Sequence, residues 1–325
     1  MNVIRVCELF AGIGGFRLGL ENASPQFQTV YANELDKWAA SIYRYHWNDN
    51  TLCEGDIKNI QTKELPNFDL LCGGFPCQPF SLAGKRQGIN DSRGTLFWEI
   101  LRIAKAKQPK IILLENVPGL LSVQQGKVFQ TIIEDLGELG YLCEWKIFNS
   151  QYFGVPQQRR RLFIVAHFAT HGGGGGAVFP LGNGSGVCFE ENREQKVCAT
   201  IMATYAKRGG GGTYIVQPRP TATNDDQFRV YANRVPTLLA RMGSGGGNVP
   251  LVLCENQGMR RLTCIECERL QGFPDNWTLT GLTVKGETKI SNTQRYKCLG
   301  NAVTTNVITQ IGKLILNFEK TGKEL

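Results

Sequence analysis

The chain has 325 residues, of which 42% are hydrophobic and 20% are charged, a composition typical of a soluble globular protein. Its length predicts two domains, or one domain with a large insertion, and its net charge of +8 suits a polyanionic partner. There is no run of eighteen apolar residues, and the 11 cysteines are odd in number and scattered, so we expect no membrane span and a reducing, cytoplasmic location.

The first half of the chain alternates apolar runs that favour strands with periodic runs that favour helices. Strands are expected at 3–10, 29–34, 68–74, 110–117, 142–148 and 161–168, and helices at 16–23, 37–47, 92–107 and 128–140. Within 37–47, Trp38, Ile42 and Tyr45 share helical spacing. Strands separated by helices of this length form parallel βαβ units, so we predict an α/β fold with a doubly wound, mostly parallel sheet.

Glycine marks a change of composition in the second half. Residues 169–259 contain 17 of the 38 glycines and show no strong helical period. Helical patterns return at 261–273 and at 302–318. The last pattern puts five apolar residues on one face: Val303, Val307, Ile311, Leu314 and Phe318. We therefore expect a smaller, loop-rich domain inserted into the first domain, on which the final helix packs.

The segment FAGIGG (10–15) stands where the first strand meets its helix, the place of a nucleotide-type cofactor loop. It is not a dinucleotide fingerprint, because Arg17 occupies the third glycine position of G-x-G-x-x-G. Glu34 ends the second strand, and Asp56 lies near the end of the next unit. The glycines of this loop could serve tight packing or the binding of a cofactor. Because carboxylates stand at successive strand ends, we favour an adenosine-bearing cofactor.

A single cysteine, Cys77, lies between two prolines in GGFPCQPFS (73–81), directly after an apolar strand. Proline restricts its own backbone and that of the preceding residue, and this stiff frame suits a nucleophile that must be presented at a set angle. Glu115 ends the fourth strand, so it should face the same crevice as Cys77. An acid beside a thiolate favours covalent attack on a ring that is protonated as it is attacked.

Three adjacent arginines follow in QQRRR (157–161), just before a strand. Strand alternation would send Arg159 and Arg161 to one side and Arg160 to the other, whereas a solvated charge run is the alternative interpretation. Cys264 and Cys267 form a lone C-x-x-C, which we interpret as part of a helix rather than as a metal site.

The order of these segments resembles one known family. FAGIGG, NELDK, GDI, GGFPCQPFS, ENV, QQRRR, RRLTCIECERLQGFPD and LGNAV are similar to the ordered motifs of the DNA (cytosine-5) methyltransferases of the bacterial and phage restriction–modification type. The resemblance runs from Val3 to about Phe318 and leaves out the glycine-rich region. It implies S-adenosylmethionine as the cofactor, a cytosine flipped out of double-stranded DNA as the substrate, and no metal.

The resemblance also implies roles for individual residues. By motif position, nine residues would bind the cofactor: Phe10, Gly12, Gly14, Glu34, Asp56, Ile57, Pro76, Leu96 and Asn301. Cys77 would add to carbon 6 of the base, and Glu115 would hydrogen-bond N3 and the exocyclic amino group. Arg159 and Arg161 would orient the base and this acid. Ala83 stands where some relatives carry a serine that helps to fill the gap left by the base, so the gap-filling residue stays open.

The resemblance divides the chain into parts. Residues 1–168, completed by 293–325, would form the catalytic domain, 169–259 the target-recognition domain, and 260–292 a connecting segment. Five residues would contact DNA: Ser81, Arg93, Arg208, Thr237 and Arg241. We expect a monomer that binds no membrane, and a cognate restriction endonuclease, if one exists, would not be bound to it.

The insert contains two similar stretches, 200–216 and 237–253. Each has a Thr-aliphatic-x-Ala run, a basic residue, a glycine cluster and a β-branched tail. They are either two hairpins that share glycine turns or two elements that read base edges.

The sequence disfavours three alternatives to a DNA methyltransferase. Arg17, and the lack of a constellation for hydride transfer, disfavour a nicotinamide-dependent oxidoreductase. The intact set of Cys77, Glu115 and Arg161 disfavours a DNA-binding relative without activity. A relative that acts on tRNA fits less well, because the large insert suits the reading of a duplex.

Overall fold

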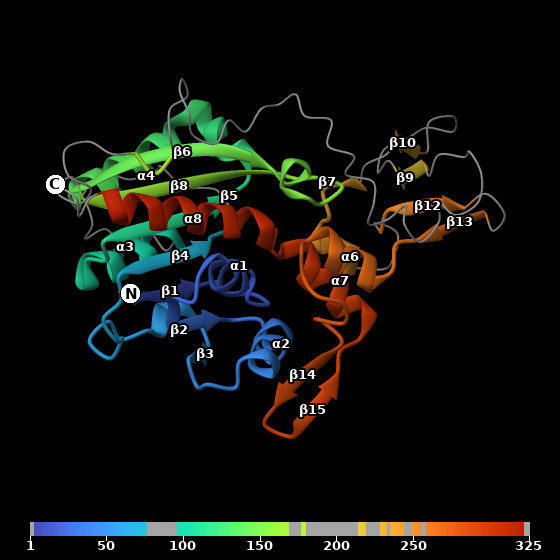
Figure 1. Ribbon diagram of the computed structural model, residues 1–325, viewed down its shortest axis with the longest axis horizontal. Helices are drawn as coiled ribbons and strands as arrows, with labels where there is room; N and C mark the ends of the chain where they lie inside the picture. The colour runs from blue at the N-terminus through green and yellow to red at the C-terminus, as the bar shows by residue number, and fades with distance from the viewer. Residues whose placement is uncertain are drawn as a thin grey trace.

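The computed structural model describes residues 3–76, 96–168, 177–179, 214–218, 228–232, 235–243, 249–254 and 258–321 of the chain. Its largest feature is a seven-stranded sheet with the order β3-β2-β1-β4-β5-β8-β6 (Figure 1). The strands are β1 (Ile4–Leu9), β2 (Phe27–Glu34), β3 (Leu52–Glu54), β4 (Leu70–Gly74), β5 (Ile111–Asn116), β6 (Tyr141–Asn149) and β8 (Arg160–Phe168). The five strands from β1 to β5 are parallel, and β8 is antiparallel to both β5 and β6. The predicted α/β fold with a mostly parallel sheet is confirmed.

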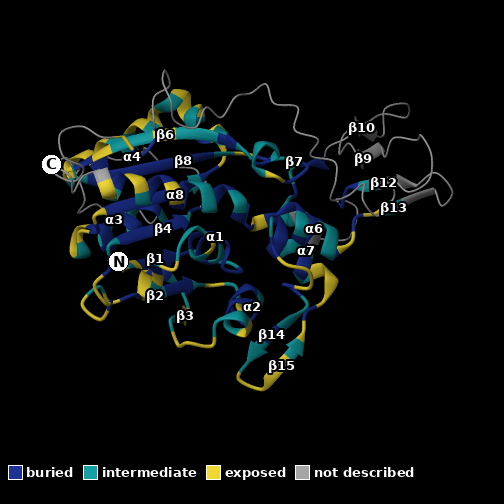
Figure 2. Cartoon of the chain, in the orientation of Figure 1, coloured by how far each residue is buried: buried dark blue, intermediate teal, exposed yellow. Residues whose placement is uncertain are grey.

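Helices cover both faces of this sheet (Figure 1). They are α1 (Gly15–Ala23) and α8 (Thr305–Thr321) on one face, α3 (Leu96–Lys107) and α4 (Lys127–Glu138) on the other, and α2 (Lys37–His46) after β2. Because strand side chains alternate, Leu70 and Leu113 pack with α1 and α8, whereas Leu71 and Leu114 pack with α3 and α4. Figure 2 shows the result, a buried central sheet under helices with exposed outer faces.

The last helix, α8, packs on α1 through the apolar face that the sequence predicts. All five predicted residues are buried; Val307, Ile311, Leu314 and Phe318 lie on α8, and Val303 lies just before the helix begins. At Gly19 the two helices come so close that a Cβ atom would lie 2.5 Å from the Cβ of Ile308. In α2 the predicted face is shifted: Tyr45 is 39% exposed, while Tyr43 is fully buried and its hydroxyl donates to Glu8.

A smaller part of the molecule is formed by residues that follow β8. An antiparallel sheet with the order β10-β9-β12-β13 lies at one end of the molecule, beyond α6 and α7 (Figure 1). Its strands are β9 (Tyr214–Pro218), β10 (Phe228–Ala232), β12 (Leu251–Cys254) and β13 (Gly258–Arg261).

Two short pairs of strands complete the β-structure of the described residues: β7 (Gln157–Gln158) pairs with β11 (Val235–Pro236), and β14 (Thr280–Thr283) pairs with β15 (Gly286–Lys289). The remaining elements are α6 (Cys264–Leu270), α7 (Asn292–Asn301), η1 (Ile57–Asn59), η3 (Pro118–Leu121), η4 (Val123–Gly126), η5 (Ser150–Phe153) and η6 (Ala240–Gly243).

The two similar stretches of the insert meet in this smaller sheet. Their tails are neighbours, because Leu251 and Val252 of β12 pair with Val216 and Ile215 of β9. The first stretch before Tyr214 lies outside the described residues. The pairing leaves open whether the two stretches are scaffold or recognition elements.

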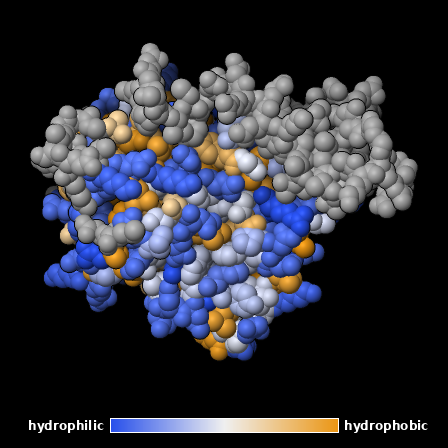
Figure 3. Space-filling view, in the orientation of Figure 1, coloured by the Kyte–Doolittle hydropathy of each residue, from blue (hydrophilic) through white to orange (hydrophobic). Residues whose placement is uncertain are grey.

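An apolar cluster joins the smaller part to the larger one. It combines Ile13 and Ile42 from the α1–α2 region with Leu238, Phe273 and Leu299 from the segments that flank α6 and α7. The face of the molecule in Figure 3 is mostly hydrophilic over its described residues, with scattered hydrophobic patches. None of the helices in the described ranges combines the length and apolar character that crossing a membrane needs.

Candidate active site

A cavity of about 560 Å³ opens at the carboxyl ends of β1, β2, β4 and β5. This is where an open α/β sheet binds its ligands, and the volume suits a cofactor-sized molecule. The lining includes Phe10, Gly12, Ile13, Glu34, Leu35, Asp36, Phe75, Pro76, Leu96, Glu115, Arg159, Arg161, Lys297 and Asn301. Both the sheet and α7 therefore contribute to one site.

The loop FAGIGG, residues 10–15, forms one wall of this cavity. Phe10, Gly12 and Gly14 have positive φ angles of 54°, 57° and 82°, which glycine tolerates and phenylalanine rarely adopts. The loop is fixed to β2, because the backbone N–H of Ala11 donates to the Asn33 carbonyl at 2.9 Å. A non-glycine residue in this conformation is typical of a functional site whose surroundings hold it in place.

Glu34 ends β2 and ties the loop to the start of α2. Its Oε2 accepts from the N–H of Gly12 and its Oε1 from the N–H of Asp36, both at 2.7 Å. Burial raises the pKa of Glu34, against these backbone hydrogen bonds. Asp36 caps α2 and pairs with Lys297 Nζ at 2.5 Å; although its burial opposes ionisation, the hydrogen bond from Lys297 lowers its pKa.

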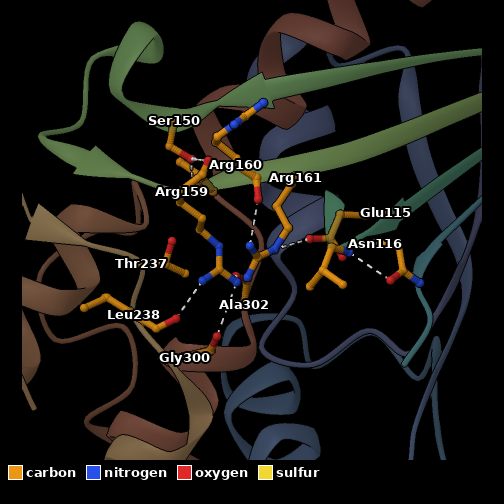
Figure 4. Close-up of polar contacts among 12 residues, drawn as sticks. Glu115, Asn116, Ser150, Arg159, Arg160, Arg161, Thr237, Leu238, Gly300 and Ala302 are labelled. Carbon is orange, nitrogen blue, oxygen red and sulfur yellow. Dashed lines mark hydrogen bonds and ion pairs between the residues drawn. The ribbon is translucent and has the colours of Figure 1, made fainter. Parts of the chain in front are cut away.

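Glu115 and Arg161 form an ion pair in the same cavity, with 2.9 Å between Glu115 Oε1 and Arg161 Nε (Figure 4). Burial raises the pKa of Glu115, although Arg161 and Arg159 act in the opposite direction. A Cβ atom at Gly74 would lie 3.0 Å from Glu115 Oε2, so the glycine of β4 leaves room for the carboxylate. An acid with a raised pKa is suited to holding a proton for a base.

Asn116, next to Glu115, fixes the chain that leads to the Pro-Cys-Gln motif. Its Nδ2 donates to the Phe75 carbonyl at 2.9 Å, and its Oδ1 accepts from the Val117 N–H at 2.8 Å. The carboxyl ends of β4 and β5 are thereby held together.

Arg159 lies on the same side as Arg161, while the exposed Arg160 points away from both (Figure 4). The Arg159 guanidinium is buried and donates to the carbonyls of Leu238 at 2.8 Å, Gly300 at 3.2 Å and Ala302 at 2.8 Å. Burial lowers the pKa of Arg159 to about 9. Its hydrogen bonds thus join three segments of backbone that surround the cavity.

The structure brings many of the predicted site residues together. Six of the nine expected cofactor residues line the cavity: Phe10, Gly12, Glu34, Pro76, Leu96 and Asn301. The lining does not include the other three. Gly14 backs onto the ring of Trp47, Ile57 is buried in the core, and Asp56 caps η1 with its Oδ1 accepting from the Lys58 N–H at 3.0 Å.

Of the residues expected to contact DNA, the structure describes the side chain of Thr237 alone. Its hydroxyl donates to the Gln158 carbonyl at 2.8 Å. Cys77, Ser81, Arg93 and Arg208 lie outside the described residues, as does the side chain of Arg241. The expected nucleophile and most of the expected DNA contacts are therefore not placed by this structure.

The cavity lining also includes residues that were not among the predicted site residues, such as Ile13, Leu35, Asp36, Phe75 and Lys297. Lys297 had a usable signal, because it precedes Asn301 by one helical turn and thus shares its face. Cys264 and Cys267 lie on α6 as expected, and the described residues contain no cluster of ligands suited to a metal ion.

Comparisons with known proteins agree on one family. The sequence profile of "C-5 cytosine-specific DNA methylase" matches residues 4–171 and 181–317. The chain is 36% identical to the type II methyltransferase M.Bsp6I of Bacillus sp. (strain RFL6), over 96% of this chain and 98% of that protein. It is 31% identical to the type II methyltransferase M.HhaI of Haemophilus parahaemolyticus, over 97% of this chain and 96% of that protein.

Solved structures share the fold. A DNMT2 variant from Spodoptera frugiperda matches with a TM-score of 0.67 and 18% identity, over 96% of this chain and 99% of that one. The Dnmt2 methyltransferase of S. pombe matches with a TM-score of 0.65 and 20% identity, over 97% and 99%. The profile covers most of the sequence, and relatives above 30% identity align over nearly its whole length. The chain therefore belongs to the C-5 cytosine-specific DNA methylases, a family that includes the methyltransferases of type II restriction–modification systems.

Proposed function

We propose that this DNA cytosine methyltransferase uses Cys77, Glu115 and Arg161 as its catalytic residues and S-adenosylmethionine as its methyl donor. The observation that carries the proposal is the half-buried Glu115–Arg161 ion pair, which shares one cavity with the FAGIGG loop. A proton donor for the base and a binding wall for the cofactor thus lie at the same sheet edge. The +8 charge of the chain suits its polyanionic substrate, double-stranded DNA.

The cavity residues fit the cofactor by their chemistry. Glu34 offers a carboxylate to the ribose hydroxyls, and Phe10, Pro76 and Leu96 offer apolar surface to the adenine. Asn301 adds an amide from α7, and Asp56, two residues beyond β3, would accept from the adenine amino group. When bound, the cofactor supplies an electrophilic methyl group on a sulfonium centre.

The protein's part in the chemistry is to make carbon 5 of cytosine nucleophilic. The Cys77 thiolate adds to carbon 6 while Glu115 gives a proton to N3, which places the electron pair of an enamine at carbon 5. After carbon 5 has gained the methyl group, it loses its proton and the Cys77 sulfur leaves. Stacking in the duplex hides the ring from these groups, so the base must be flipped out.

Arg161 has two roles in this scheme. It holds the Glu115 carboxyl group in place through their 2.9 Å ion pair, and its positive charge favours ionisation of the Cys77 thiol, whose ordinary pKa is about 8.5. Arg159 adds positive charge beside Glu115 and positions the surrounding backbone. We further propose that residues 169–259 recognise the target sequence and that the enzyme acts as a monomer.

Trapping with 5-fluorocytosine tests the nucleophile directly. Because fluorine cannot leave as a proton does, the wild-type enzyme should form a stable covalent complex with a duplex that carries 5-fluorocytosine at its target. Cys77→Ala should form none and transfer no methyl groups, yet bind the cofactor as the wild type does. Cys53→Ala is the matched control, because Cys53 is an exposed cysteine on β3, outside the cavity lining. Methyl transfer by Cys77→Ala would refute the mechanism.

A further inference from the structure

We propose that Trp277 is a positioning residue that holds the FAGIGG loop in its cofactor-binding conformation. The inference rests on the proposed assignment of the cavity to S-adenosylmethionine. Trp277 lies 264 residues from the loop in sequence, within the segment that connects α6 to β14. Its indole Nε1–H donates to the Ile13 carbonyl at 3.0 Å, in a buried environment.

The contact falls at the point of the loop where the backbone most needs support. Ile13 stands between Gly12 and Gly14, whose left-handed conformations glycine adopts freely, and follows Phe10, a non-glycine residue in the same region. The conformation of Phe10 persists only where neighbouring groups hold the loop in place. Side chains anchor the loop at two adjacent residues, Glu34 at the Gly12 N–H and Trp277 at the Ile13 carbonyl.

The indole of Trp277 is itself held in place by aromatic neighbours. The His46 ring is stacked on it, with 3.5 Å between centroids and 6° between planes, and Trp47 and Phe273 pack at 5.4 Å and 5.5 Å. His46 Nε2 also donates to the Trp277 carbonyl at 2.7 Å. The N–H group therefore has a fixed direction toward the loop.

A buried ion pair supports Trp277 from the other side. The Thr278 N–H donates to Glu268 Oε1 at 2.8 Å, and Glu268 pairs with Arg295 Nη2 at 3.0 Å. Glu268 is on α6 and Arg295 is on α7, the helix that also carries Lys297 and Asn301 into the cavity. Trp277 thus links the loop that follows β1 to α6 and α7, and α7 supplies Lys297 and Asn301 to the cavity lining.

Trp277→Phe tests the inference, because it keeps a ring in the cluster and removes the N–H donor. The affinity for S-adenosylmethionine, measured by calorimetry, should fall about 3- to 10-fold, the effect of losing one buried hydrogen bond. Trp145→Phe is the matched control: it makes the same change at an exposed tryptophan of β6, which packs on Phe129 and is outside the cavity lining. The control should change the affinity less than twofold.

Hydrogen exchange of the free protein supplies a readout that needs no ligand. The backbone amides of residues 11–14 should exchange faster in Trp277→Phe than in Trp145→Phe. If the phenylalanine variant fails to fold, benzothienylalanine at position 277 replaces the N–H by sulfur while keeping the shape of the ring. Unchanged loop exchange and unchanged affinity in either Trp277 variant would overturn the inference and leave the proposed function intact. A wild-type protein that binds no S-adenosylmethionine would refute the proposed function instead, and the exchange comparison would still decide the role of Trp277.

Discussion

Replacing Arg159 by methionine would remove one guanidinium that holds three segments of backbone. The side chain donates to the carbonyls of Leu238, Gly300 and Ala302 at 2.8, 3.2 and 2.8 Å, all in the interior. A buried carbonyl left without a partner costs about 1–3 kcal/mol, so three would cost about 3–9 kcal/mol. Burial also disfavours the charge of Arg159, as its lowered pKa indicates. Removing this buried charge therefore offsets part of the cost of the three unpaired carbonyls. We expect a net loss of about 3 kcal/mol in the free energy of unfolding.

Urea denaturation measures this loss as a lower midpoint. Arg160→Met is the matched control, because Arg160 is the adjacent arginine, is exposed, and points away from the site (Figure 4). It should unfold within about 0.5 kcal/mol of the wild type. Arg159→Lys keeps the positive charge but cannot form the same fork of hydrogen bonds, so it should fall between the two. Equal midpoints for Arg159→Met and Arg160→Met would show that the three carbonyls do not depend on this side chain.

Two further predictions concern the carboxylates of Glu34 and Glu8. Glu34→Gln should weaken S-adenosylmethionine binding about tenfold or more, by calorimetry, because a charged acceptor for ribose is lost; Glu54→Gln, on the neighbouring strand and paired with Arg44, should not. Burial raises the pKa of Glu8 from 4.5 to about 8, so its stabilising effect is complete below pH 4.5 and is lost as the pH rises to 8. Glu8→Gln should therefore flatten the decline in unfolding free energy between pH 5 and pH 8, by about 1.4 kcal/mol per pH unit. Parallel pH curves of the two proteins in urea unfolding would contradict the burial of an ionising Glu8.

The sheet and its helices could be predicted because their signals are local. Apolar runs such as 110–117 fill strands that are buried on both faces, and the apolar stripe of the last helix has a period that only a helix satisfies. The position of β8 between β5 and β6 carries no such signal, since strand order is decided by tertiary packing. The shift from Tyr45 to Tyr43 in α2 has the same origin, because Tyr43 is drawn inward by its hydrogen bond to the buried Glu8.

The residues of the candidate site also differ in whether the sequence could predict them. Glu34 and Glu115 could be anticipated because each ends a strand, and strand ends of a parallel sheet meet at one edge. Trp277 could not be anticipated, because it donates to Ile13, which lies 264 positions away in the sequence. Contacts of this kind leave no periodic pattern in the sequence around either partner.

Contacts between distant segments also join the insert to the strand that carries the cavity arginines. Gln157, just before Arg159, accepts from the Leu238 N–H at 3.0 Å and donates to the Leu270 carbonyl at 2.8 Å. Leu238 of the insert and Leu270 of α6 are thus held by one buried side chain, on the same short stretch that carries Arg161 to Glu115. Changes within the insert that we propose reads DNA can alter the sequence recognised without moving Glu115, whereas movement of the clamped frame would displace the base site and the cofactor loop together.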